Sequence, residues 1–131
     1  MYKAFFVSLP VKDLEKSKEF FSKLGFSFEP IYTYANALCM VIGKNCYVML
    51  INEPVFNKIV VKEICDPFTF KESYVSISVS SKAEVDNYIK KATKLGATEH
   101  QHLLDKNDYS FMYVKGFSDL DGHLWMISFF Q

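Results

Sequence analysis

The sequence has no excess of charge of either sign, since its 131 residues include 15 basic and 15 acidic side chains. Proteins that bind nucleic acids usually carry a basic surface, so this balance argues against a nucleic-acid partner. Apolar runs stay far below the roughly 18 residues that a membrane-spanning helix needs. Polar residues interrupt the first ten positions, and no signal-peptide layout is recognisable, so we expect a cytoplasmic protein with no membrane partner.

Cysteine is also scarce, and the cysteines that occur follow no metal-binding or redox spacing. An odd number of unpatterned cysteines is typical of a reducing compartment, where thiols stay free. Two of the three lie in apolar, strand-like runs, which favours core packing over reactivity. The three are Cys39, Cys46 and Cys65. Apolar side chains, by contrast, make up half of the chain, enough for the core of a single domain.

The chain contains an internal repeat that begins with a strand and a helix. Residues 7–11 match residues 75–79 at a constant offset, and both segments alternate branched or aliphatic with small or polar side chains, as strands do. A helix start follows each strand, with Asp13 as one N-cap and a capping box at 81–84 as the other.

Both predicted helices end in Lys-Leu-Gly, at 23–25 and at 94–96. Gly25 and Gly96 suit the left-handed conformation that often terminates a helix. Turn residues then divide the rest of each half into three strands. These predicted strands cover about 26–33, 36–43 and 46–52, and about 97–104, 109–117 and 123–130.

The order βαβββ therefore occurs twice, in modules of about 1–53 and 73–131 within one domain. The linker 54–72 shows no clear period, and we expect at most one short helical turn in it. One helix covers only one face of its sheet, so the other face needs a partner. The sequence predicts an α+β fold in which the two modules form a curved mixed sheet around a cleft.

Side chains alternate between the two faces of a strand, so the strand pattern also predicts the cleft residues. If Val7, Leu9 and Val11 lie beneath the first helix, the even-numbered positions of that strand face the cleft. The same parity applies to the corresponding strands. The side chains expected to line a ligand cleft are Phe6, Ser8, Tyr47, Met49, Tyr74, Ser76, Ser78, Met126 and Ser128, with Ile51 and Leu124 nearby.

Three segments carry a family resemblance. They are Leu-Pro-Val-Lys-Asp-Leu-Glu-Lys-Ser at 9–17, Phe-Phe-Ser-Lys-Leu-Gly-Phe at 20–26 and Phe-Ser-Asp-Leu-Asp-Gly-His-Leu-Trp at 117–125. With the repeat, they resemble the vicinal oxygen chelate superfamily, which includes glyoxalase I, fosfomycin-resistance proteins, extradiol dioxygenases and bleomycin-resistance proteins. The branch most similar is that of small glyoxalase-like proteins, the predicted lactoylglutathione lyases. Because family members often pair modules between chains, the resemblance implies a homodimer.

Enzymes of this superfamily hold a divalent metal with four side chains, usually His or Glu. The resemblance places those four positions at Phe6, Met49, Tyr74 and Met126. The metals of the family prefer imidazole nitrogen or carboxylate oxygen, which these residues lack. We therefore expect neither a metal nor another cofactor, and without a Lewis acid the shared chemistry of the superfamily is lost.

Three functions remain open from the sequence. A cleft of aromatic, thioether and serine side chains favours a metal-independent protein that binds a small, partly apolar molecule. The second possibility is a lyase or dioxygenase of the family that uses a displaced metal or none. The third is a partner-binding module in which the side chains at the four ligand positions pack against one another and fill the cleft.

The remaining polar candidates favour structural roles. His100 and His102 share one face of a predicted strand, as in some zinc sites, but no third ligand is evident. His123 follows a tight turn, and Asp119 and Asp121 are expected to cap and shape that turn. A dimer interface could use aromatic residues near the linker and the C-terminus, namely Phe68, Phe70, Phe129 and Phe130.

Overall fold

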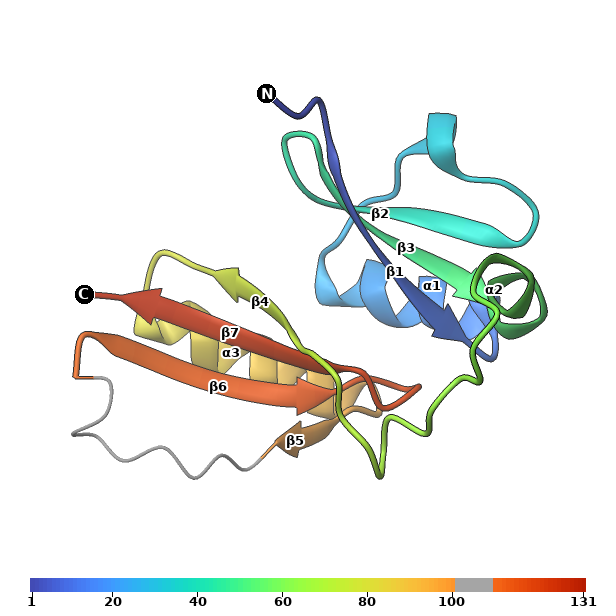
Figure 1. Cartoon of the computed structure of the whole chain (residues 1–131). Coiled ribbons are helices and arrows are strands. Elements are labelled where there is room, and N and C mark those ends of the chain that lie inside the picture. Colours follow the sequence, from blue (N-terminus) through green and yellow to red (C-terminus); the bar gives the residue numbers. More distant parts are fainter. Residues whose placement is uncertain (101–109) are drawn as a thin grey trace. The chain divides into compact units, whose positions relative to one another are not determined.

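The computed structural model describes residues 1–100 and 110–131, which form two compact units, Met1–Cys65 and Asp66–Gln131 (Figure 1). Each unit contains a mixed β-sheet and a long helix, which confirms the predicted α+β class. The boundary between the units falls inside the segment 54–72 that the sequence assigns to a linker. In the described part of the chain, no helix combines the length and the apolar character that crossing a bilayer requires.

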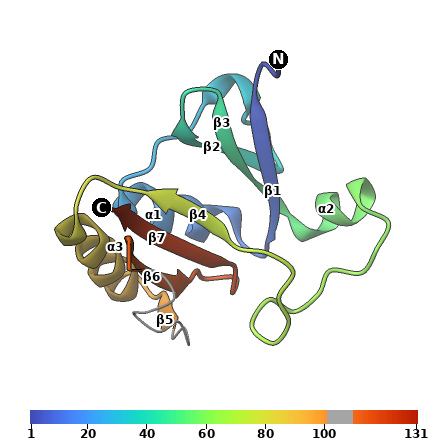
Figure 2. The ribbon, with the colours of Figure 1, turned by 60° about the vertical axis from the view of Figure 1, so that its left-hand side comes forward.

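The sheet of the first unit has the strand order β1-β3-β2 (Figure 2). Strand β1 (Phe5–Val11) runs parallel to β3 (Cys46–Asn52), and β2 (Ala37–Gly43) runs antiparallel to β3. Helix α1 (Leu14–Leu24) follows β1 and packs on β2 and β3. A parallel pair needs such a crossover, because its strands cannot be joined by a tight hairpin.

Local signals set the ends of α1 where the sequence predicts them. The Asp13 carboxylate accepts a hydrogen bond from the Lys16 amide at 3.1 Å, and Gly25 adopts a φ of 116° at the C-terminal end. Between them, the side chains of α1 that face the sheet are buried: Ser17, Phe20, Phe21 and Leu24. Sheet residues of the first unit are also buried, namely Val11, Met40, Val48 and Leu50.

The strand predicted at 26–33 is wrong. Phe28 forms an isolated bridge with Met40, and a short 3₁₀ helix, η1 (Pro30–Tyr32), follows it. Proline has no amide hydrogen to give to a sheet ladder and its φ suits the start of a helical turn. Glu29 completes this turn, since its carboxylate accepts a hydrogen bond from the Ile31 amide at 3.2 Å.

The linker contains more regular structure than the sequence indicates. Helix α2 (Glu53–Ile59) begins directly after β3 and has seven residues, which exceeds a single turn. The Asn52 side chain caps it by accepting from the Val55 amide at 3.1 Å, and Pro54 occupies its first turn. Both residue types are favoured at these positions, so this helix start was present in the sequence as a local signal.

The sheet of the second unit has the order β4-β7-β6-β5. Strand β4 (Val75–Ser78) runs parallel to β7 (Leu124–Phe130), while β6 (Met112–Ser118) is antiparallel to β7 and pairs with β5 (Thr98–His100). Helix α3 (Lys82–Lys94) packs against β6 and β7. The second unit thus repeats the arrangement of the first. The rest of the strand predicted at 97–104 and the start of that predicted at 109–117 lie outside the described residues.

A buried carboxylate holds the turn before β7. Asp119 is 4% exposed, and its Oδ1 accepts the amides of Asp121 and His123, both at 2.9 Å. Its Oδ2 accepts the indole N–H of Trp125 at 2.9 Å, and Trp125 stacks on Phe117 in the core. Burial raises the pKa of Asp119, while the charge of His123 and these hydrogen bonds oppose the increase. The turn-shaping role expected for Asp119 is therefore confirmed.

Replacing Asp119 with asparagine should destabilise the protein. The new amide would turn an N–H group toward one of the three donors, so a buried donor loses its partner. We expect the free energy of unfolding to fall by about 1–3 kcal/mol. Denaturant unfolding followed by Trp125 fluorescence measures this loss.

The matched control is Asp13→Asn, because asparagine caps a helix about as well as aspartate. It should change the free energy of unfolding by no more than a few tenths of a kcal/mol. Equal losses in the two variants would contradict the special role of the buried carboxylate.

Candidate functional site

One face of the first sheet, opposite α1, carries the residues that the sequence assigns to a ligand cleft. Phe6 is paired with Tyr47, and Ser8 with Met49, in the parallel register of β1 and β3. Side chains paired in this way share a face, and their alternation with buried Val48 places them away from α1. We call this surface, defined by Phe6, Ser8, Tyr47 and Met49, the aromatic face.

Three aromatic rings form a cluster on the aromatic face. The rings of Phe6 and Tyr47 stack with their centroids 5.1 Å apart, and Tyr32 stands across both at 5.7 Å from each. Such stacked and edge-to-face contacts are favourable geometries for aromatic pairs. Phe6 and Tyr32 nevertheless remain 44% and 46% exposed, so the cluster is ordered and also accessible.

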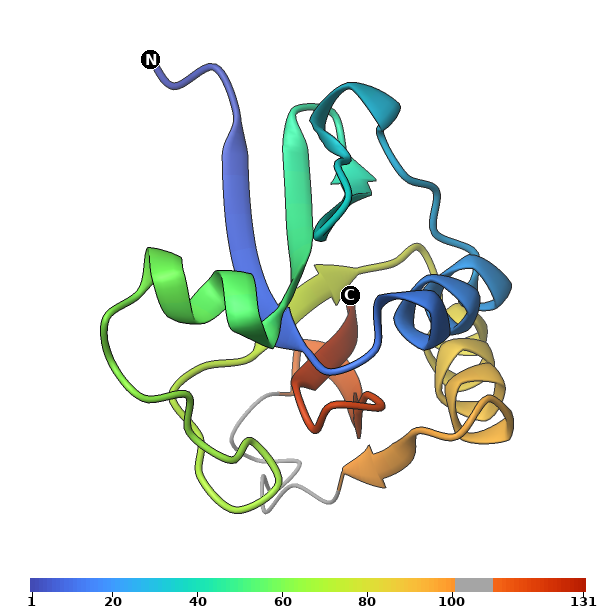
Figure 3. The ribbon, with the colours of Figure 1, turned by 90° about the vertical axis from the view of Figure 1, so that its right-hand side faces the viewer.

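The segment that carries Tyr32 is hydrogen-bonded to β2, and its short helix η1 lies at the top of the view in Figure 3. The Glu29 amide donates to the Cys39 carbonyl at 2.8 Å, and the Cys39 amide donates to Thr33 Oγ1 at 3.1 Å. The Thr33 hydroxyl in turn donates to the Glu29 carbonyl at 2.8 Å. These three hydrogen bonds fix residues 29–33, which therefore hold Tyr32 and the Glu29 carboxylate in defined positions.

Sequence reasoning missed Tyr32 and Glu29 as parts of this site. In the strand predicted at 26–33, Glu29 and Tyr32 would point to opposite faces, because side chains alternate along an extended chain. The local signal that identifies the turn is the pair Glu29-Pro30, an N-cap residue followed by proline.

Two titratable groups of this site, the Tyr47 phenol and the Cys39 thiol, have raised pKa values. Burial raises the pKa of the Tyr47 phenol, and Tyr32, Glu29 and Cys39 raise it further. Burial and the charge of Glu29 likewise raise the pKa of the Cys39 thiol. At neutral pH both groups are protonated, so Tyr47 offers an O–H group and Cys39 is not a nucleophilic thiolate.

The corresponding face of the second sheet lies opposite α3. Met126 is paired with Ser76, and Ser128 with Ser78, between β7 and β4. Tyr74 lies just before β4 and is exposed. The parity predicted from the sequence therefore agrees with the strand register in both units.

Two of the expected cleft residues on this second face are buried. Met126 is 8% exposed because its sulfur lies directly over Gly116, where a Cβ would overlap it. Ser128 is 1% exposed, and its hydroxyl donates to the Ile77 carbonyl at 3.4 Å. Neither side chain is accessible to a ligand, so the exposed rings of the first unit are the stronger candidate for ligand contact.

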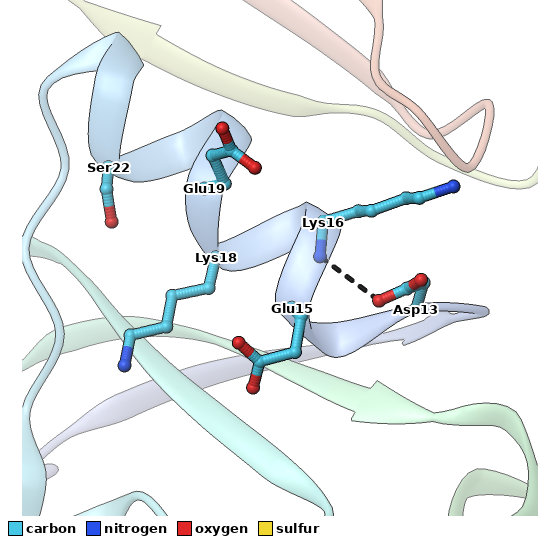
Figure 4. Close-up of a pocket in the computed structure, with 6 residues that line it drawn as sticks. All are labelled: Asp13, Glu15, Lys16, Lys18, Glu19 and Ser22. Atoms are coloured by element: carbon cyan, nitrogen blue, oxygen red, sulfur yellow. Dashed lines mark hydrogen bonds between the residues drawn. The ribbon is translucent and has the colours of Figure 1, made fainter.

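A hollow of about 610 Å³ also lies over the charged face of α1 (Figure 4). Its lining side chains are all exposed and include both acidic and basic groups. Asp13 already caps the helix, and Glu19 pairs with Lys23 at 2.6 Å. The hollow has the character of a solvated helix surface, and we assign no site to it. Its lining residues are Asp13, Glu15, Lys16, Lys18, Glu19 and Ser22.

The histidine candidates do not form a recognisable centre within the described chain. His100 is half-buried on β5 and is paired with Gly116, whereas His102 lies outside the described residues. His123 lies in the turn organised by Asp119. Over residues 1–100 and 110–131, no three His, Cys, Asp or Glu side chains gather in a way that could hold a metal ion.

Comparison with known families gives a match in the N-terminal part of the chain. Residues 3–43 match the family model of the bleomycin resistance protein-like N-terminal domain. This segment includes β1, α1, η1 and β2 of the first unit. No curated protein sequence matches the chain significantly.

Solved structures match the chain over nearly its whole length. A hypothetical protein from S. aureus is 26% identical with a TM-score of 0.81, covering 98% of this chain and 95% of that protein. A glyoxalase/bleomycin resistance protein/dioxygenase family enzyme from Burkholderia phytofirmans PsJN is 15% identical with a TM-score of 0.79, covering 96% and 97%.

A mutant of the fosfomycin resistance protein from Listeria monocytogenes, solved with Mn(II) and 1S,2S-dihydroxypropylphosphonic acid, is also similar. It is 16% identical with a TM-score of 0.66, and the match covers 97% of this chain and 87% of that protein. The chain therefore has the fold of the glyoxalase, bleomycin resistance and dioxygenase proteins of the vicinal oxygen chelate superfamily.

Proposed function

We propose that this chain is a glyoxalase-like protein of the superfamily that lacks the metal ligands of its enzymes and binds a small, partly apolar molecule. The observation that carries the proposal is the cluster of Phe6, Tyr32 and Tyr47. Phe6 and Tyr47 lie on paired strands, and Tyr32 lies in the hydrogen-bonded segment 29–33. The rings of Phe6 and Tyr32 nevertheless remain nearly half exposed. A ready-formed apolar surface with a few polar groups is typical of small-ligand sites.

The side chains at the four metal positions do not suit a divalent cation. Phe6 has no donor atom, and its ring is stacked on Tyr47. The sulfur of Met126 packs over Gly116, and the thioethers of Met49 and Met126 are soft ligands. This donor set supports binding without a metal, so we derive no chemical step that passes through one.

The alternative is a metal-dependent lyase or dioxygenase. It gains support from the fold shared with the fosfomycin resistance protein that was solved with Mn(II). In this chain such an enzyme would need ligands at positions other than Phe6, Met49, Tyr74 and Met126.

Protein purified without a metal-affinity tag should contain Mn, Fe, Ni and Zn far below one equivalent per chain. The protein would be incubated with each ion and dialysed against metal-free buffer, and elemental analysis would then measure the metal that remains bound. An equimolar ion that survives dialysis would favour the enzyme alternative.

Binding itself should be visible with 2-naphthol, a soluble, neutral aromatic probe. We expect saturable shifts of the ring resonances of Phe6, Tyr32 and Tyr47 in NMR spectra. Removing one ring by Tyr32→Ala should weaken binding roughly 3- to 10-fold, because aromatic stacking is lost. Trp125 fluorescence suits this test poorly, since that side chain is buried in the second unit.

The matched control for this experiment is Tyr34→Ala. Tyr34 is exposed near the same segment, and its hydrogen bonds to Ala37 use backbone atoms only. Binding by this variant should equal that of the unchanged protein. Equal binding by Tyr32→Ala would contradict a ligand site at the cluster.

The packing of Met126 on Gly116 can be tested separately. In Gly116→Ala the added methyl group must displace the sulfur and also approaches the Trp125 carbonyl at 3.1 Å. Overpacking of this kind should lower the free energy of unfolding by roughly 1–3 kcal/mol. Denaturant unfolding and the Met126 methyl resonance report the change.

Gly43→Ala is the control, because a Cβ at Gly43 would have nothing within 4 Å. It should leave stability unchanged or raise it slightly. If Gly116→Ala behaved in the same way, Met126 would be free to move toward a ligand or an ion.

We further propose that the protein forms a homodimer in the cytoplasm. Three free cysteines, one of them exposed, suit a reducing compartment. Exposed rings in the second unit supply apolar surface for a second chain, and Phe130 stacks on Phe111 at 6.3 Å. The exposed phenylalanines of this unit are Phe68, Phe70, Phe111 and Phe130.

Light scattering should give twice the mass of one chain. Phe130→Ser should shift the population toward the monomer by removing apolar contact area. Tyr2→Ser, which changes an exposed ring of the first unit, should have no such effect. A monomeric mass for the unchanged protein would refute the dimer.

A further inference from the structure

The aromatic cluster offers more than apolar surface. The face of an aromatic ring is electronegative and attracts a cation placed over it. Because Tyr32 lies at 87° to Phe6 and 68° to Tyr47, the cluster presents ring faces in two directions. An alkylammonium group could therefore contact more than one ring from the exposed side.

The segment that carries Tyr32 also carries a carboxylate, that of Glu29. The main chain of Glu29 is bonded to β2 through Cys39 and Thr33, and its carboxylate accepts the Ile31 amide. The side chain is therefore oriented as well as anchored. Its charge contributes to the raised pKa of Tyr47 and of Cys39, so its field reaches the polar end of the cluster.

From this geometry we infer that the ligand of the aromatic face carries a positive charge, as an organic ammonium ion held by the rings of Phe6, Tyr32 and Tyr47 and by the carboxylate of Glu29. This inference rests on the proposed function and adds the charge of the ligand. A neutral aromatic molecule would use the rings alone, and an anion would be repelled by Glu29. The combination of ring faces and one oriented carboxylate favours the cation.

The test compares three probes of similar size that differ in charge: benzyltrimethylammonium, benzyl alcohol and phenylacetate. Ring resonances of the cluster would be followed in NMR titrations at low ionic strength. The ammonium ion should bind roughly 10-fold more tightly than benzyl alcohol, with contributions from both the cation–π contact and Glu29. Phenylacetate should bind most weakly.

Glu29→Gln removes the negative charge, and the side-chain oxygen of the substituted residue can still accept a hydrogen bond from the Ile31 amide. It should reduce the preference for the ammonium ion over benzyl alcohol roughly 3- to 5-fold and leave benzyl alcohol binding unchanged, as expected for the loss of one partly exposed charge. Glu15→Gln is the matched control, because Glu15 is an exposed carboxylate on α1. This variant should keep the full preference.

The outcomes separate the two proposals. Comparable binding of the ammonium ion and benzyl alcohol, or equal preference in Glu29→Gln and the unchanged protein, would overturn the inference of a cation and leave the proposed function standing. Saturable binding of none of the three probes at the cluster would overturn both.

Discussion

The exposed aromatic surface depends on the hydrogen bonds between residues 29–33 and the edge of β2. Cys39 contributes both its carbonyl and its amide, and Thr33 closes the turn by bonding to β2 and to Glu29 at once. Without these bonds, Tyr32 would belong to a free loop, and its ring would lose conformational freedom each time it met a ligand. Because folding has already ordered it, contact with a ligand carries less of that entropic cost.

The two units share one topology but differ on the sheet face that points away from the helix. Both pair their first strand in parallel with their last and pack a helix on one face. On the other face, the first unit has accessible rings, whereas in the second a methionine sulfur occupies the space above Gly116. A repeat therefore supplies the framework, and single residues on the face away from the helix decide whether that face is open or filled.

The sequence predicts the framework well because its signals are local. Strand parity, the N-cap at Asp13 and the positive φ of Gly25 and Gly96 depend on neighbours in the chain, and the structure agrees with them. The predicted strand at 26–33 failed because Pro30 lies inside it, where it has no amide hydrogen for a sheet ladder and begins a 3₁₀ helix instead. The burial of Met126 could not be foreseen, since it depends on a glycine in the adjacent strand that only the cross-strand register brings beneath it.

The aromatic cluster also bears on how this fold can recognise positive charge. At the position of Phe6, the resemblance to the superfamily implies a side chain that binds a metal through a lone pair. A benzyl ring there has no lone pair to donate, but it has a π face, and Tyr32 and Tyr47 add two more. Such faces suit large, weakly hydrated organic cations, because a small divalent ion keeps its water shell unless oxygen or nitrogen ligands replace it. The residues that make this surface poor for a metal are therefore the same ones that suit it to an ammonium group, with Glu29 supplying the compensating charge.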